Sequence, residues 1–109
     1  MFEVKGTTIT LTRGDTGAVM FEILAADGGA YTPREGDRVR FAAKKSVTDE
    51  APCILKGIPT DTMTLTLEPE DTKALEPDAY VYDVQITFAG GEVATFVPKS
   101  RLNIAEEVD

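Results

Sequence analysis

Short segments in which apolar and polar residues alternate make up most of the chain, and turn residues separate them. Successive side chains of a β-strand point to opposite faces, so alternation over a few residues is typical of a strand with one buried face. The segment from Thr8 to Thr12 is the simplest case, because Ile9 and Leu11 share one face and the threonines share the other. The period of about 3.6 residues that marks an amphipathic helix is nearly absent. The pattern therefore favours an all-β fold.

The same alternation predicts strands along the rest of the chain, each with one row of side chains that faces the core. These rows are Val19, Phe21 and Ile23; Val39, Phe41 and Ala43; Met63, Leu65 and Leu67; and Tyr80, Tyr82, Val84, Ile86 and Phe88. One or two further strands, at 92–97 and 100–104, are interrupted at Pro98. A weaker strand at 53–58 has two candidate registers, with either Ile54 and Ile58 or Cys53 and Leu55 inward.

Glycine, proline and aspartate mark the breaks between these strands. The segments 25–29 (AADGG) and 32–37 (TPREGD) are typical of loops, and Gly90 with Gly91 predicts a hairpin turn. We expect one short helix of about two turns, which begins with Pro69 at its first helical position and stops before Pro77.

Strands at intervals of about 10 residues in a chain of 109 favour a single domain, residues 1–109, with an acidic tail over about 105–109. We predict an all-β, immunoglobulin-like antiparallel β-sandwich of about seven to eight strands with one short helical crossover. A small closed barrel is the alternative. In such sandwiches a tyrosine after the crossover commonly hydrogen-bonds back across the corner, and Tyr80 is the candidate. Burial of Tyr80 and Tyr82 as ordinary core residues is the other interpretation.

Charge excludes several classes of partner. The chain has 11 lysines and arginines against 19 aspartates and glutamates, which gives a net charge of -8, and it has no histidine. Nucleic acid and anionic membranes repel such a chain, and no apolar run is long enough to span a bilayer. We therefore predict neither nucleic acid nor membrane as a partner. The first residues also lack the basic start and apolar run of a signal peptide.

The residue types that catalysis and metal binding need are scarce. Without histidine a Ser-His or Cys-His pair cannot form, and Cys53 within a strand is typical of a buried, inert thiol. A single thiol excludes the common zinc sites, and the loop acids Asp15, Asp27, Glu35 and Asp37 match no calcium loop. We predict no catalytic residue, no cofactor and no metal, so the chain is not expected to be an enzyme.

Two short motifs have ordinary structural interpretations. Arg13, Gly14 and Asp15 resemble an integrin-binding tripeptide, but a turn between strands also requires glycine and aspartate. The final four residues, EEVD, are similar to the tails of cytosolic eukaryotic chaperones, which helical-repeat clamps bind. The prediction here is a solvated acidic terminus.

Two longer segments carry a resemblance to a known family. They are ITLTRGDTGAVMF at 9–21 and LTLEPEDTKALEPDAYVYDV at 65–84. These segments resemble small domains in the tail and baseplate proteins of bacteriophages and prophages, above all the N-terminal domain of baseplate upper proteins. The Asp-Gly turn at 27–29 and RFAAKKS at 40–46 fit the same pattern. Baseplate upper proteins continue beyond this domain, whereas this chain ends at Asp109, so we expect a small accessory or connector piece of a virion, or a prophage remnant.

The resemblance implies a non-enzymatic structural or assembly module that acts through protein-protein contacts. Its partners would be other tail or baseplate subunits, with self-association as a homo-oligomer as the alternative. The chain would be made in the bacterial cytoplasm and would reside in the virion tail once assembled. The alternative function is an immunoglobulin-like adhesion or ligand-binding domain of a bacterial protein.

Outward side chains on the predicted strands supply the candidate partner-binding residues. The apolar candidates are Met20, Leu24 and Val81, which oppose the inward rows of their strands. The basic candidates are Arg38, Arg40 and Lys44, which form an outward stripe with Lys45. On an acidic protein such a stripe is suited to an acidic partner.

Overall fold

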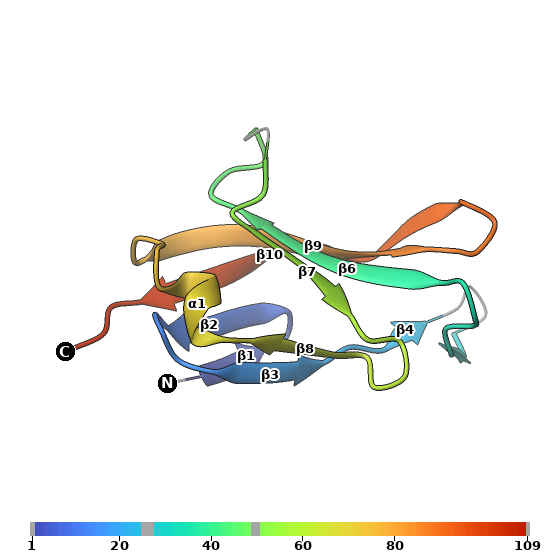
Figure 1. Cartoon of the computed structure of the whole chain (residues 1–109), viewed down its shortest axis with the longest axis horizontal. Coiled ribbons are helices and arrows are strands. Elements are labelled where there is room, and N and C mark those ends of the chain that lie inside the picture. The colour runs from blue at the N-terminus through green and yellow to red at the C-terminus, as the bar shows by residue number, and fades with distance from the viewer. Residues whose placement is uncertain (1, 25–27, 49–50, 109) are drawn as a thin grey trace.

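The computed structural model describes residues 2–24, 28–48 and 51–108, and these contain ten strands and one short helix (Figure 1). The strands are β1 (Phe2–Lys5), β2 (Thr8–Thr12), β3 (Gly17–Met20), β4 (Ile23–Leu24), β5 (Ala30–Tyr31), β6 (Arg38–Lys44), β7 (Ile54–Ile58), β8 (Thr64–Leu67), β9 (Asp78–Thr87) and β10 (Val93–Ala105). The helix is α1 (Pro69–Thr72). The structure is thus mostly β, in agreement with the predicted class.

Six of these strands form the main sheet, in the order β1-β2-β10-β9-β6-β7. All neighbours are antiparallel except β2 and β10, which pair in parallel with Ile9 beside Leu102 and Leu11 beside Ile104. The expectation of an antiparallel sheet is therefore wrong at this junction. The error has a simple cause: alternation predicts which face of a strand is buried but not the direction of the strand beside it.

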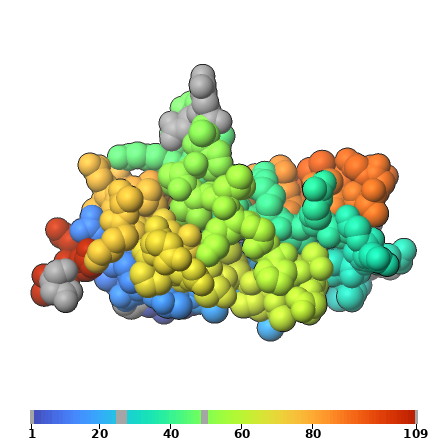
Figure 2. All heavy atoms as spheres, viewed as in Figure 1, coloured from blue at the N-terminus to red at the C-terminus, as the bar shows by residue number. Residues whose placement is uncertain are grey.

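The opposite layer is smaller and consists of the antiparallel pair β3 and β8, extended by the short β4–β5 hairpin (Figure 1). The pair lies close to both edges of the main sheet. On one side the ring of Phe2 in β1 covers Gly17 in β3, and on the other Lys56 Nζ in β7 donates to the Thr66 carbonyl oxygen in β8 at 2.7 Å. Figure 2 shows β7, β8 and α1 covering this second side. Among the described residues no backbone ladder joins the layers, so the strands do not close into the alternative barrel.

The predicted inward rows form the core. Its most buried members are Ile9, Leu11, Val39, Phe41, Ala43, Leu65, Leu67, Tyr82, Val84, Ile86, Leu102 and Ile104. The rings of Phe41 and Tyr82 stack with centroids 5.1 Å apart, and Phe88 is half-buried at the end of its row. In β7 the core side chains are Ile54 and Ile58, which decides the register that the sequence left open.

Three features differ from the prediction. The number of strands is larger because β1 and the two-residue strands β4 and β5 are present. The last strand is continuous through Pro98, with register irregularities between Thr95 and Val97 and between Val97 and Ser100. The turn at 25–29 lies only partly within the described residues, since 25–27 fall outside them.

The helix α1 is one turn long, not two. It does begin with Pro69 at a first helical position, and the Asp71 carboxylate accepts the Glu68 backbone N–H at 2.7 Å. The helix ends at Thr72, which is buried and accepts the Gly14 backbone N–H on its Oγ1 at 2.8 Å. Contacts with distant segments, which the local pattern cannot predict, therefore set its length. No helix in the described part of the chain has the length and apolar content needed to cross a membrane.

The tyrosine at the corner after α1 behaves as predicted. Tyr80 Oη donates to the Glu76 carbonyl oxygen at 2.8 Å, across the bend that leads into β9. Tyr82, one inward position further on, donates to the carbonyl oxygen of Thr7. Both rings belong to the core as well, so each tyrosine combines burial with a hydrogen bond to backbone.

Candidate protein-binding face

The outward side of the main sheet is exposed along four adjacent strands, β7, β6, β9 and the first part of β10. Alternation places their buried residues on the inner side, so the opposite positions share one outer surface. The register brings Lys44, Val81 and Arg101 into one row across β6, β9 and β10. A second row contains Arg40 and Gln85, with Gly57 on the β7 side. We call this surface the basic face.

Five basic side chains gather on the basic face: Arg38, Arg40, Lys44, Lys99 and Arg101. They are five of the 11 in the chain, whereas Asp83 is the only acid at an outward position of these strand segments, out of 19. The face therefore has a net charge of about +4, and the rest of the chain about -12. This separation of charge is not visible in the net value of -8.

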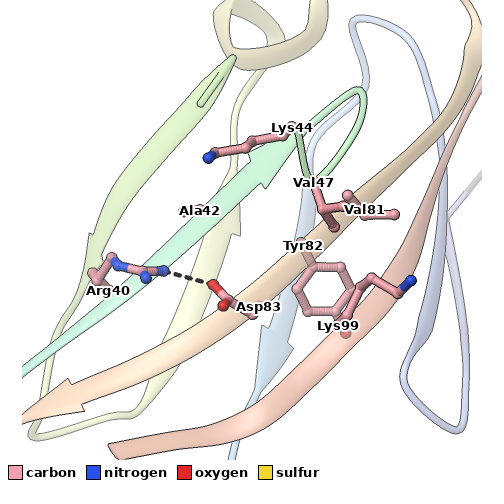
Figure 3. A pocket seen from close by; sticks show the side chains of 8 residues that line it. All are labelled: Arg40, Ala42, Lys44, Val47, Val81, Tyr82, Asp83 and Lys99. Carbon is pink, nitrogen blue, oxygen red and sulfur yellow. Dashed lines mark hydrogen bonds and ion pairs between the residues drawn. The ribbon is translucent and has the colours of Figure 1, made fainter. Parts of the chain in front are cut away.

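One ion pair lies within the basic face. Arg40 Nη1 donates to Asp83 Oδ1 at 2.8 Å, and both side chains are 34% exposed (Figure 3). An ion pair at this level of exposure contributes little to stability, about 0 to 1 kcal/mol. Arg38, Lys99 and Arg101 are exposed and form no ion pair with any described residue. Their charge is therefore directed to solvent or to a partner.

Two shallow hollows interrupt the basic face. The first, of 220 Å³, lies between β6, β9 and β10, where Val81 and Val47 supply apolar walls and Lys44 and Lys99 stand at its sides (Figure 3). The second, of 710 Å³, lies over β6 and β7 beside Gly57, whose missing side chain leaves open space. Exposed Leu55 borders it. The face thus combines cationic groups with apolar hollows, a mixture typical of protein interfaces.

The structure brings together only some of the predicted partner-binding residues. Arg38, Arg40, Lys44 and Val81 lie on the basic face, where Val81 is half-buried. Met20 and Leu24 lie on β3 and β4 in the other layer, with 73% and 65% of their surfaces exposed.

Lys45, the fourth residue of the predicted basic stripe, does not share the surface of the other three. Its Nζ lies 3.2 Å from Asp78 Oδ2, and this carboxylate raises the pKa of Lys45.

Sequence reasoning missed Lys99, Arg101, Leu55 and Val47. Lys99 and Arg101 follow Pro98 in a strand whose alternation is broken by two irregularities, so their outward direction could not be inferred from spacing. Leu55 belongs to the strand with two candidate registers, and Val47 lies in a loop. For Lys99 and Arg101 the available signal was a basic side chain beside an alternating segment of the sequence.

The two short motifs meet in one contact instead of acting separately. Arg13 Nη2 and Lys73 Nζ lie 3.1 and 2.8 Å from the two carboxylate oxygens of Glu107. Both cations lower the pKa of Glu107, Lys73 having the larger effect and Arg13 the smaller. The glutamate side chain is only 18% exposed. The predicted solvated terminus is therefore wrong at Glu107, because the cations that hold it come from segments far away in the sequence.

The loop acids and Cys53 are the positions that the sequence offered for a metal site or a thiol. The described residues contain no group of three or more histidine, cysteine, aspartate or glutamate side chains that could hold a metal ion. Asp27 lies outside the described residues. Cys53 is exposed, contrary to the predicted burial, because β7 begins only at Ile54; its Sγ donates to the Ala43 carbonyl oxygen at 3.3 Å.

Comparison with known proteins adds no relative: neither a scan against protein-family models nor a search of curated proteins finds a match to the chain.

Proposed function

We propose that the chain is a non-enzymatic structural module of a phage or prophage tail or baseplate, and that its basic face binds an acidic surface of a neighbouring subunit. The gathering of five of the 11 basic side chains on one side of a sheet carries this proposal. On a protein of net charge -8, such a face attracts an acidic partner in one orientation and disfavours the others. The setting in a tail or baseplate comes from the resemblance of residues 9–21 and 65–84 to domains of those proteins.

The chemistry of the basic face favours a protein over nucleic acid. Single-stranded nucleic acid binds where aromatic rings offer stacking platforms, and the outward positions of β6, β7 and β9 carry no aromatic side chain. Duplex binding depends on uninterrupted cationic contacts with phosphate, whereas Asp83 stands among the basic residues. Apolar Leu55 and Val81 instead suit the surface of a folded partner.

We also infer that the fold is an immunoglobulin-like sandwich. The neighbouring strands β6, β9 and β10 correspond in order to the C, F and G strands of that fold, and β3 with β8 corresponds to its B and E strands. The hydrogen bond from Tyr80 to Glu76 at the entry to β9 supports the assignment, because a tyrosine commonly makes such a bond near the start of strand F.

Co-purification with the proteins encoded beside this chain, among which we expect tail proteins, tests the function. We expect one of them to bind the wild type and to lose binding when Lys99→Glu and Arg101→Glu are combined, because two repulsive charges then stand on the face. Binding by the wild type should also weaken as salt is raised from 0.05 to about 0.5 M, since salt screens exposed charges.

The matched control is Lys5→Glu combined with Arg34→Glu, which makes the same change of charge at two exposed positions outside the basic face. The proposal is contradicted if the control loses binding equally, or if none of these tail proteins binds the wild type. Binding of duplex DNA by the wild type, lost in the face variant alone, would replace the protein partner with nucleic acid.

A further inference from the structure

Strand β10 has a neighbouring strand along most of its length on one side, but along only a short part of its length on the other. Residues 102–105 pair with residues 9–12 of β2, while β9 accompanies β10 on its other side from Val93 to Ile104. Among the described strands, none pairs with residues 93–101 on the side away from β9. This half of β10 is therefore an open sheet edge, with backbone N–H and C=O groups available for pairing.

An apolar groove of 480 Å³ follows the open edge where residues 94–96 lie. One wall comes from the inner sides of β9 and β10, and the other comes from the β4–β5 hairpin. The residues that matter for the argument are Ile86, Phe88 and Phe96 on the first wall and Ile23, Leu24 and Tyr31 on the second. Tyr31 and Phe88 meet edge to face, with ring centroids 5.6 Å apart, so the two walls touch at that point.

We propose that this open edge and groove bind an extended segment of another protein, which adds to the six-stranded sheet as a further strand beside β10. A strand in that position would pair its backbone with β10, as β2 does along the other half. Every second side chain of the segment would point inward and enter the groove, while the others would face solvent. The interaction is independent of the basic face and goes beyond the proposed function.

The groove also indicates the composition of its occupant. Its lining is apolar apart from threonine and one charged residue, Glu22, which is exposed and forms no ion pair with a described residue. An occupant with alternating apolar residues and a lysine or arginine beside them would complement both features. A cationic segment also suits a protein of net charge -8.

The same edge limits how long the added strand can be. Pro98 has no N–H to donate, irregularities in register lie between Thr95 and Ser100, and exposed Lys99 follows. Such features discourage indiscriminate pairing of sheet edges. A short added strand therefore fits the part of β10 that borders the groove, opposite the β4–β5 hairpin.

Selection from a displayed library of short random peptides tests the proposal, with the whole chain as bait. The two variants to compare are Leu24→Asp, in the groove, and Met20→Asp, which changes a similarly exposed apolar residue on β3 outside it. We expect selected peptides to alternate apolar residues and to carry a lysine or arginine. Their affinity should fall roughly tenfold to a hundredfold in Leu24→Asp, since the buried apolar contact is lost, and should stay unchanged in Met20→Asp.

Backbone pairing has its own readout. Binding of a selected peptide should slow amide hydrogen exchange at residues 93–97, and N-methylation of alternate peptide nitrogens should abolish binding. The proposal is overturned if no selected peptide distinguishes the two variants, if the exchange of residues 93–97 does not change, or if N-methylated peptides bind as well as their parents. None of these outcomes bears on the basic face, so the proposed function is tested separately.

Discussion

Asp37 joins three segments through one carboxylate. Its Oδ2 accepts the Tyr31 hydroxyl at 2.6 Å and the Arg34 backbone N–H at 2.8 Å, and its Oδ1 accepts the Ala89 backbone N–H at 3.0 Å. These donors hold the pKa of Asp37 below its ordinary value, Arg34 having the largest effect. Gly36 allows this arrangement for two reasons. It adopts φ +91°, a conformation that favours glycine, and a Cβ at this position would lie 2.8 Å from the Cβ of Ala89. A loop acid that spacing could relate only to turns or calcium is thus a structural acceptor.

Tyr80 is the residue at which a single hydrogen bond can be tested. Tyr80→Phe removes the donor to the Glu76 carbonyl and keeps the buried ring, so we expect a loss of about 1 kcal/mol in the free energy of unfolding, the usual net value of one hydrogen bond. Urea denaturation followed by circular dichroism measures it. Unchanged stability would mean that the corner needs only the ring.

The edge strand β1 packs against β3 through the aromatic ring of Phe2. The ring of Phe2 occupies the space above Gly17, where a Cβ would lie 2.3 Å from Phe2 Cδ1. The layers thus approach each other at a residue without a side chain, while the backbone of β1 pairs with β2 in the main sheet. Packing of this kind depends on volume and not on pattern.

A pair of glycine substitutions tests this contact. Gly17→Ala must displace the half-buried Phe2 ring, so we expect a loss of about 2 kcal/mol in the free energy of unfolding. The control is Gly57→Ala in β7, where nothing lies within 4 Å of the added Cβ; it should be neutral or slightly stabilising, because glycine weakens a strand. Equal effects of the two changes, measured by thermal denaturation, would contradict the packing argument.

At the scale of the whole molecule, charges of opposite sign occupy different regions. The basic face holds about +4, and the acids are distributed over turns, the helix region and both ends. Several acids are nevertheless integrated into the fold: Asp37, Asp78 and Glu107 have lowered pKa values because of N–H and cationic donors. Glu68 is the opposite case, since neighbouring Glu70 raises its pKa.

These shifts predict a broad pH range of stability. A carboxyl group with a lowered pKa stabilises the fold above its ordinary value, here 3.8 for aspartate and 4.5 for glutamate, and loses that contribution as the pH falls through the folded value. Tyr31, Tyr80 and Tyr82 have raised pKa values, so stability is also lost as the pH rises above 10.0. We expect the melting temperature to fall at both ends.

The variant Glu107→Gln separates the contribution of the terminal contact. It removes the charge that Lys73 and Arg13 hold, so the melting temperature should decrease near neutral pH and depend less on pH below 4.5. Thermal denaturation across the acid range measures both effects. An acid slope identical to that of the wild type would show that Glu107 contributes nothing to the pH dependence.

The sequence by itself determined the class of the fold and most of the core. Rows such as Val39, Phe41 and Ala43 repeat every second residue, and such a repeat fixes the buried face of a strand through local geometry alone. The basic residues Arg38, Arg40 and Lys44 could be placed on one outer surface for the same reason. The hairpin at Gly90 and Gly91 was also predictable, since its turn requires glycine in a left-handed conformation.

Only the tertiary structure decided what lies beside what. The parallel pairing of β2 with β10, the addition of Lys99 and Arg101 to the basic face, and the binding of Glu107 by Arg13 and Lys73 join residues that are distant in the sequence. Spacing along the chain carries no information about such neighbours, because strand order and direction follow from how the whole core packs. The chain of net charge -8 therefore acquires a cationic surface, and β10 an open edge, only once it is folded.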